Sequence, residues 1–214
     1  MLMTTQLLDE RFETMPWELI DTVVFDVGNV LLEWNPKKIV AAMYPGNEAL
    51  QQMLMEKVFT SPYWPEMDLG RMSLEEIRQK MIGDDRSLEK EITHALEGWV
   101  YEMDPVDEGV KTLYQCKAHG KKTCVLSNFS AAFFAEACAM HPFFQQFDRM
   151  VVSGAEKLCK PDPAIYRLAT ERTDTAPERT LFMDDMRKNV EAAMALGWQG
   201  LWIDRPEKLT TFFK

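Results

Sequence analysis

The sequence predicts an α/β protein in which a doubly wound parallel sheet carries a helical insert after its first strand. Short apolar runs such as Val23–Phe25 show no polar alternation, which is typical of strands buried on both faces of a parallel sheet. From Asp104 onward, helical and strand patterns alternate with short connections, as they do in doubly wound sheets. Between these two regions the apolar residues recur at helical spacing.

The composition is that of an ordinary soluble globular protein. The chain has 214 residues, enough for one large core or for a core with a smaller insert. A net charge of −10 disfavours nucleic acid and anionic membranes as partners. We expect no signal peptide and no bilayer-spanning helix, because no apolar run is long enough. The 4 cysteines contain no CxxC pair, which favours reduced thiols and a cytoplasmic location. The sequence does not indicate the oligomeric state.

The first strand, Val23–Phe25, ends at Asp26, and a helix is expected to begin soon after it. Asn35 is a favourable N-cap and Pro36 is a favourable first helical residue. Ahead of the strand, residues 1–20 contain a short helical pattern to which we assign no function.

The helical insert follows this strand. Ser73 and Glu76 have the spacing of a capping box, which predicts the start of a helix. The aromatic and proline-rich segment Phe59–Gly70 predicts a structured loop. We therefore expect residues 35–103 to form a separate helical unit, and the core to consist of residues 1–34 and 104–214.

The second half of the chain predicts the remaining strands of the sheet. Asp104 and Pro105 are expected to start a helix that ends near His119 and Gly120. Short buried strands separated by helical patterns then follow at about Thr123–Ser127, Met150–Ser153, Leu181–Met183 and Leu201–Ile203.

Polar groups follow the first two strands, at the carboxyl ends where open α/β sheets hold their ligands. Asp26 ends the first strand, although a polar residue that simply marks the exit from the core explains it equally well. Ser127 and Asn128 end the second strand, where a hydroxyl and backbone amides can hold an anion. For these two residues alone, a plain turn before a helix capped by Ser130 is the simpler explanation.

Lys160 and a pair of acids complete the candidate site. Pro161 restricts the backbone beside Lys160 and so directs its ammonium group, although a lysine before a helix is common. Asp184 and Asp185 follow a buried strand, and adjacent carboxylates there repel each other unless a cation neutralises them. Magnesium is a hard cation that prefers carboxylate oxygens. The alternative is that these acids cap the following helix, which explains one acid more easily than two.

The order of these features resembles the haloacid dehalogenase-like (HAD) superfamily. Strand-Asp, helical insert, strand-Ser, Lys-Pro and strand-Asp-Asp follow one another over nearly the whole chain. The resemblance implies a Rossmann-like core with a helical C1 cap at residues 35–103. Phe25–Val30 and Asp68–Ser73 look closest to the branch that includes bacterial α-glucose-1-phosphate phosphatase. The matching segments are Phe25–Val30, Val125–Asn128, Lys160–Asp162 with Ile165 and Tyr166, and Phe182–Asp185 with Asn189.

The resemblance implies a magnesium-dependent phosphatase for a small phosphorylated metabolite. Asp26 is then the nucleophile that forms an aspartyl-phosphate. The implied magnesium ligands are the carboxylates of Asp26, Asp185 and Asp184 and the backbone carbonyl of Gly28. The cation would shield the nucleophile from a dianionic substrate.

The same resemblance assigns the anion-binding groups. Ser127 and the backbone amide of Asn128 are implied to hold phosphate oxygens, and Lys160 to neutralise the phosphate and the nucleophile. Asn189 stands where the family often has an Asp that supports this lysine or the waters of the metal.

The chain departs from the family pattern at Gly28, where most phosphatases of the superfamily carry a second Asp that transfers the proton. General acid–base catalysis is typically worth 10²- to 10⁴-fold, or about 3–5 kcal/mol. A leaving group of low pKa, such as the anomeric oxygen of a sugar, would depend less on being protonated. Glu33 is a candidate replacement, although a solvated loop residue explains it equally well. Weak or lost activity is the third outcome.

Two other functions remain open. A 2-haloacid dehalogenase needs no metal, and its nucleophile motif also lacks the second acid, so Gly28 does not discriminate between a dehalogenase and a phosphatase. Asp184 and Asp185 disfavour the dehalogenase, because paired carboxylates have no role without a cation. A non-enzymatic phosphate-binding or regulatory protein is the other alternative, which the otherwise complete set of catalytic residues disfavours.

The cap is expected to set the substrate and to open and close over the site. Trp64 and Arg71 are the candidate substrate contacts, the first for a sugar face and the second for another anion. Most aromatic residues at helical spacing belong to the core, so the remaining candidates are expected to be largely structural: Trp34, Phe59, Tyr63 and Trp99.

Overall fold

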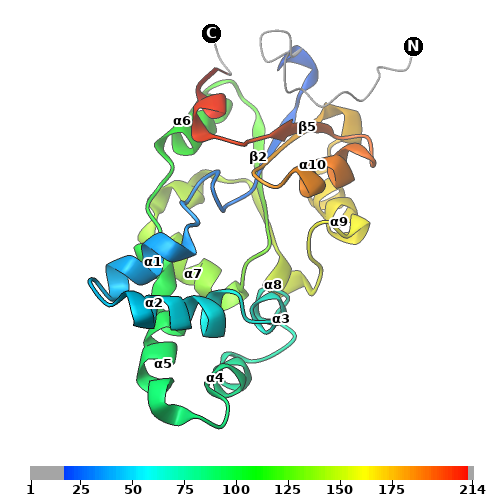
Figure 1. The fold of residues 1–214 in the computed structure, drawn as a ribbon. Helices are drawn as coiled ribbons and strands as arrows, with labels where there is room; N and C mark the ends of the chain where they lie inside the picture. The colour runs from blue at the N-terminus through cyan, green and yellow to red at the C-terminus, as the bar shows by residue number, and fades with distance from the viewer. Residues whose placement is uncertain (1–16, 212–214) are drawn as a thin grey trace.

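The computed structural model describes residues 17–211, so the short helix expected within residues 1–20 lies mostly outside the described part. Figure 1 shows two stacked parts: a sheet flanked by helices in the upper half and a group of helices, α1 to α5, in the lower half. Helices α1 to α5 lie within the residues 35–103 that were predicted to form the insert.

The sheet has 5 parallel strands in the order β3-β2-β1-β4-β5. Its strands are β1 (Thr22–Phe25), β2 (Lys122–Ser127), β3 (Arg149–Val152), β4 (Thr180–Asp184) and β5 (Gln199–Trp202). The central strand β1 pairs with β2 and β4, with Phe25 opposite both Val125 and Met183. The carboxyl ends of these three strands therefore lie side by side, and the predicted doubly wound α/β fold is confirmed.

Both faces of the sheet are buried. Val23 and Phe25 belong to a hydrophobic cluster with residues of α6 (Asp107–Ala118) and α7 (Ala131–Met140). Val24, between them, belongs to a second cluster with residues of α9 (Pro163–Thr173) and α10 (Arg187–Met194). Burial on two faces explains why the strand is apolar without alternation. The shorter elements of the core are η2 (Trp17–Leu19), η6 (Pro142–Gln146), α8 (Ser153–Glu156), η7 (Pro177–Arg179) and η8 (Pro206–Thr211).

The insert is helical, as predicted. Asn35 caps its first helix by accepting a hydrogen bond from the Lys38 backbone amide, and Ser73 and Glu76 form the expected capping box. Its elements are α1 (Pro36–Met43), α2 (Glu48–Leu54), the π-helix η3 (Met55–Phe59), α3 (Trp64–Asp68), α4 (Leu74–Ile82), η4 (Arg86–Leu88), α5 (Glu89–Gly98) and η5 (Trp99–Glu102).

Two local predictions were wrong, and a third is confirmed only in part. The segment Phe59–Gly70 is more than a loop, because it contains the short helix α3. The helix expected at Asp104 begins three residues later, since Pro105 is held in an antiparallel bridge with Leu32. Ser130 takes the predicted N-cap position of α7, but its side chain makes no capping hydrogen bond.

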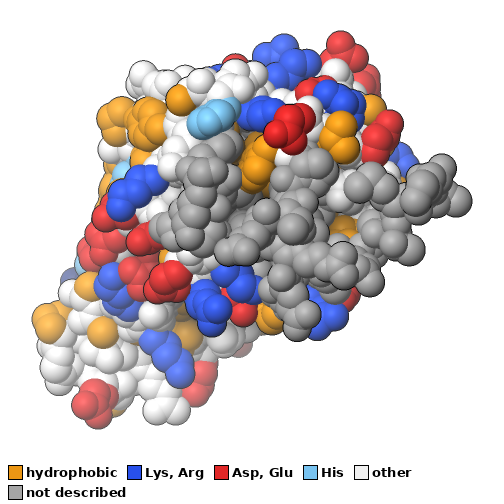
Figure 2. All heavy atoms as spheres, turned by 90° about the horizontal axis from the view of Figure 1, so that it is seen from above, with side chains coloured by type: hydrophobic (Ala, Val, Ile, Leu, Met, Phe, Trp, Pro, Cys, Tyr) orange, Lys and Arg blue, Asp and Glu red, His pale blue; other side chains and the backbone are white. Residues whose placement is uncertain are grey.

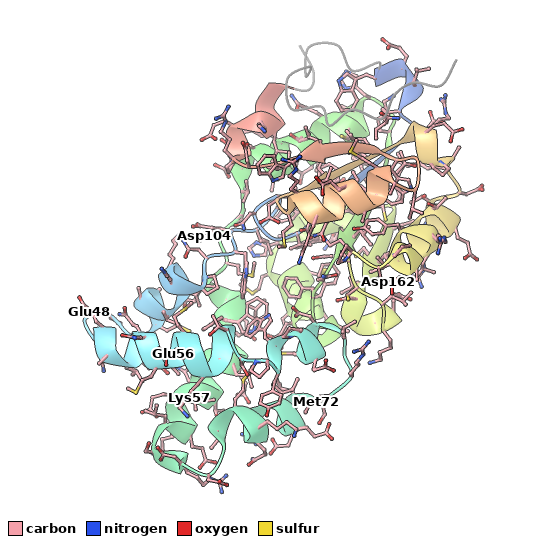
Figure 3. The ribbon with its side chains drawn as sticks, turned by 45° about the vertical axis from the view of Figure 1, so that its right-hand side comes forward. Glu48, Glu56, Lys57, Met72, Asp104 and Asp162 are labelled. Atoms are coloured by element: carbon pink, nitrogen blue, oxygen red, sulfur yellow. The ribbon has the colours of Figure 1, made fainter. Side chains whose placement is uncertain are left out.

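The two connections between core and insert run antiparallel beside each other. The Glu33 amide donates to the Asp104 carbonyl at 2.8 Å, and the Val106 amide donates to the Leu31 carbonyl at 2.9 Å. Asp104, labelled in Figure 3, lies at this junction. One hydrophobic cluster extends across these crossings from the sheet into the insert, so the division of the chain next to residues 34 and 104 stays a prediction.

Acidic, basic and hydrophobic side chains are interspersed on the face shown in Figure 2. Among residues 17–211, no helix is both long and apolar enough to cross a bilayer.

Candidate active site

Three carboxylates meet at the carboxyl ends of the neighbouring strands β1 and β4. Asp26 directly follows β1, Asp184 ends β4 and Asp185 follows it. Each offers one oxygen such that the three atoms lie within 4.8 Å of one another. This donor set fits a hard divalent cation such as Mg²⁺, which takes carboxylate oxygens and keeps several waters.

Lys160 is the counter-charge in this group. Its Nζ lies 2.8 Å from Oδ1 of Asp26 and 2.7 Å from Oδ2 of Asp184, and only 2% of its side chain is exposed. The side chain of Asn128 fixes the lysine backbone, because it accepts from the Lys160 amide at 2.8 Å and donates to the Lys160 carbonyl at 2.9 Å. Sequence reasoning considered only the backbone amide of Asn128 and missed this role.

The site carries more negative charge than one lysine neutralises. Burial raises the pKa of Asp26 to about 8; the Asp184 and Asp185 charges add to the rise, and Lys160 opposes it. The pKa of Asp185 is raised chiefly by burial, against a hydrogen bond from Asn29. Burial lowers the pKa of Lys160, but the Asp184 and Asp26 charges outweigh it and the net shift is upward. A bound cation would relieve this repulsion and lower the carboxylate pKa values.

Asp184 is the anchor of the group. Its carboxylate accepts from Lys160, from the Met186 backbone amide at 2.7 Å and from Nδ2 of Asn189 at 3.0 and 3.1 Å. Asn189 is itself held by Tyr166, whose hydroxyl donates to the Asn189 carbonyl at 2.9 Å. Asn189, which was predicted to support the lysine or the waters of the metal, therefore contacts Asp184, and Asp184 in turn binds Lys160.

Asn29 is a residue of the site that sequence reasoning missed. Its backbone is left-handed, with φ at 55°, a conformation that Asn tolerates better than most residues. Nδ2 donates to Oδ2 of Asp185 at 2.9 Å, while Oδ1 accepts from the Trp34 amide at 2.9 Å. Asn29 thus orients the third carboxylate from the loop that follows β1.

Ser127 ends β2, next to β1, and its residue is 1% exposed. The adjacent loop is tied to the core through Phe129, whose amide donates to Oγ of Ser153 at 2.9 Å. Ser127 and the start of this loop therefore lie at the same edge of the sheet as Asp26.

A small cavity of about 50 Å³ lies beside Gly28, under the helical insert. Trp34, Trp64 and Trp99 form much of its wall, with ring centroids 5.2 to 5.4 Å apart. The predicted substrate contact Trp64 therefore lies at the site. The complete lining is Gly28, Trp34, Trp64, Asp68, Trp99, Met103 and Phe129.

The other cap candidates lie elsewhere. Arg71 does not line this small cavity, nor the second cavity described below. Its side chain is 58% exposed and approaches Glu66 at 3.7 Å. Phe59 packs on Trp34 and Trp64, and Tyr63 contacts Lys80. These two aromatic residues have the structural role expected for most of the set.

A larger cavity of about 640 Å³ reaches Asp185. Asn29, Glu33 and Asp185 contribute to its wall, together with the segment 202–206 after β5. The Glu33 carboxylate pairs with Nζ of Lys38 at 2.6 Å and its side chain is 37% exposed. This cavity offers a route from solvent to Asp185.

Comparison with known proteins identifies the family to which this site belongs. The family model described as haloacid dehalogenase-like hydrolase matches residues 20–197. The sesquiterpene phosphatase AstK of Aspergillus oryzae is 26% identical over 178 residues, which is 83% of this chain and 87% of that protein. The D-ribitol-5-phosphate phosphatase of Bacteroides thetaiotaomicron is 24% identical over 187 residues, 85% of this chain and 90% of that protein.

Solved structures share the fold. A HAD family enzyme from Bacteroides thetaiotaomicron, crystallised with magnesium and inorganic phosphate, has a TM-score of 0.70 at 20% identity and matches 86% of this chain and 93% of its own. L-2-haloacid dehalogenase from Xanthobacter autotrophicus has a TM-score of 0.63 at 20% identity, over 87% of this chain and 78% of its own.

Proposed function

The chain belongs to the haloacid dehalogenase-like hydrolase family, and we propose that it is a magnesium-dependent phosphatase of small phosphorylated metabolites. The observation that carries this proposal is the third carboxylate. Asp26 and Asp184 share Lys160, whereas Asp185 is held beside them by Asn29, and the ion pairs of the group within residues 17–211 include no second lysine or arginine. A buried excess of negative charge is stable when a divalent cation joins it.

In the proposed reaction Asp26 attacks phosphorus and becomes an aspartyl-phosphate, which water then hydrolyses. Lys160 offsets charge on the nucleophile and on the phosphoryl oxygens, and Ser127 with the amide of Asn128 holds those oxygens. Asp26, Asp185 and the Gly28 carbonyl are the proposed metal ligands, with Asp184 beside them. When bound, the metal would shield the nucleophile and stabilise the charge of the transferring group.

The substrate is proposed to be a small phosphate monoester, a sugar phosphate among the candidates. Relatives at about a quarter identity include phosphatases named for ribitol 5-phosphate and for sesquiterpenes, so both polar and apolar leaving groups are compatible with the family. Trp64 at the small cavity suits the face of a sugar or an apolar chain. Glu33 and Arg71 are proposed contacts for the parts of a substrate that extend beyond it.

A metal-independent 2-haloacid dehalogenase is the second candidate, supported by the fold it shares with the Xanthobacter enzyme. The carboxylate triad argues against it, because halide displacement by Asp26 has no use for Asp185.

Phosphate release from a panel of phosphate esters, with added Mg²⁺ and with chelator, tests the proposal. We expect release that requires Mg²⁺ and stops on chelation. Release that persists after complete metal removal would contradict the mechanism, and metal-independent halide release from 2-chloropropionate would favour the dehalogenase. Magnesium binding without turnover of any ester would favour a binding or regulatory protein.

Asn29→Gly is expected to weaken magnesium binding about 10- to 100-fold, because the amide that orients Asp185 is lost. Glycine keeps the left-handed backbone available, so the loop itself is not strained. Isothermal titration of Mg²⁺ into metal-free protein measures the effect. Asn47→Gly, at the cap of α2, is the matched control and should leave the affinity unchanged; equal affinities for Asn29→Gly and wild type would refute this role.

A further inference from the structure

The space beside Gly28 is where a proton donor is missing. A Cβ atom at Gly28 would lie 3.5 Å from Cβ of Trp34, an ordinary contact, so packing does not demand the glycine. The small cavity opens there, and the insert supplies its opposite wall. Asp68, the last residue of α3, is the one carboxyl group among the described residues that line it.

Asp68 is fixed to the core as well as to the insert. The backbone amide of Ser130, in the loop after Ser127 and Asn128, and the side chain of Trp64 lie close enough to the Asp68 carboxyl group to lower its pKa. The carboxyl group therefore lies over the loop that is proposed to hold the phosphate.

The backbone around Asp68 is docked on α8. The Asp68 carbonyl accepts from Oγ of Ser153, and the Gly70 carbonyl accepts from Nζ of Lys157. Gly70 has φ at 58°, and a Cβ there would lie 2.4 Å from the Gly154 carbonyl oxygen, so this contact needs glycine. These contacts hold Asp68 against the core.

Burial raises the pKa of Asp68 to about 7, although Ser130 and Trp64 oppose the rise. An aspartic acid of ordinary pKa is fully ionised at neutral pH and has no proton to give. Efficient general acids and bases have a pKa near the working pH. The environment of Asp68 is therefore that of a proton-transfer group.

The cavity has room for one small polar group. Its volume of about 50 Å³ accommodates a leaving oxygen or one attacking water, which occupies about 30 Å³ in the liquid. Trp99 lines it, is 2% exposed, and its indole nitrogen has no hydrogen-bond partner within residues 17–211. A buried donor without a partner costs free energy unless a ligand or water completes it.

We propose that Asp68 is the general acid–base residue of this enzyme, supplied by the insert in place of the side chain absent at Gly28. The inference rests on the proposed phosphatase function. As Asp26 attacks phosphorus, the bond between phosphorus and the ester oxygen breaks, its electron pair stays on that oxygen, and the Asp68 carboxyl gives it a proton. An alcohol, the aspartyl-phosphate and the Asp68 carboxylate result.

In the second half of the reaction Asp68 acts as the general base. Its carboxylate takes a proton from the water that attacks phosphorus, the bond from phosphorus to Asp26 breaks, and inorganic phosphate leaves. Asp68 is then protonated again and Asp26 is a carboxylate. Glu33 is less suited to these steps, because it pairs with Lys38 and lines the other cavity.

The leaving group of the substrate tests this role. Asp68→Asn keeps the shape of the side chain and removes the transferable proton. We expect kcat/KM for an alkyl phosphate to fall about 10²- to 10⁴-fold, and for acetyl phosphate, whose leaving group needs no proton, to fall less than about 10-fold. Hydrolysis of the aspartyl-phosphate should slow for both substrates, so a burst of about one equivalent of acetate should precede steady turnover.

Glu66→Gln, on the same helix but directed to Arg71, is the matched control and should leave both rates unchanged. A loss of kcat/KM for Asp68→Asn that is equal for the two substrates would assign Asp68 a structural role and overturn the proposal, as would wild-type values of kcat/KM for both. If wild-type protein releases phosphate from neither substrate with Mg²⁺, the proposed function fails. If wild-type protein releases phosphate from both substrates and Asp68→Asn does so with the same kcat/KM values, only the role of Asp68 fails.

Discussion

Asp26→Asn is expected to abolish turnover and at the same time to stabilise the metal-free protein. An amide cannot form the aspartyl-phosphate, and removing the nucleophile of a covalent mechanism costs on the order of 10⁴-fold or more in kcat. Phosphate release under saturating substrate and Mg²⁺ measures this loss. Activity within about 10-fold of wild type would show that Asp26 is not the nucleophile.

The gain in stability follows from the charge of the site. The pKa of Asp26 is about 8 in the folded protein against an ordinary value of 3.8, so between these pH values the folded state holds a proton that the unfolded state has lost. The folded state therefore loses stability as pH rises through this window. Asparagine removes that loss and can still accept from Lys160, which keeps its bond to Asp184.

We expect Asp26→Asn to raise the free energy of unfolding by at least about 1 kcal/mol at pH 8 without metal, and to change it little below pH 4. Urea titrations at the two pH values measure this difference. Saturating Mg²⁺ should stabilise wild type more than the variant, because the variant has lost one ligand. A variant that is less stable than wild type at pH 8 without metal would contradict the proposed excess of negative charge.

The sequence predicts those parts of the site that local patterns determine. Asp26 and Asp185 follow apolar runs, and the carboxyl ends of adjacent parallel strands must meet, so their proximity follows once the alternation is recognised. Lys160 was assigned by resemblance, and the structure brings its ammonium group to both neighbouring carboxylates.

The contacts that were missed run between segments whose relative position no local pattern determines. The side-chain amides of Asn29 and Asn128 bridge separate loops, and asparagine in a loop has many other uses. Asp68 ends a helix that was expected to be a loop, and its approach to Gly28 depends on how the whole insert packs on the sheet. Such packing is a tertiary property, and only the structure reveals it.

Lys160→Met is expected to cost about 3–5 kcal/mol of unfolding free energy without metal, together with most of the activity. Lys160 and Asp184 are almost completely buried, and removing one partner of a buried pair leaves the other charge uncompensated. Asp26 then retains its proton to higher pH and is a poorer nucleophile, so we expect kcat to fall about 10²-fold or more. Lys111→Met, at an exposed position of α6, is the control and should change stability by less than about 0.5 kcal/mol.

A double variant separates charge from packing as the cause of this loss. If the uncompensated carboxylate is responsible, adding Asp26→Asn to Lys160→Met removes one negative charge and should stabilise the protein more than Asp26→Asn stabilises wild type. If the lost lysine stem is responsible, the two effects should simply add, because a neutral Asn does not refill the space. Unfolding free energies of the four proteins at pH 8 give the coupling, and additivity within about 0.5 kcal/mol would refute the electrostatic account of Lys160.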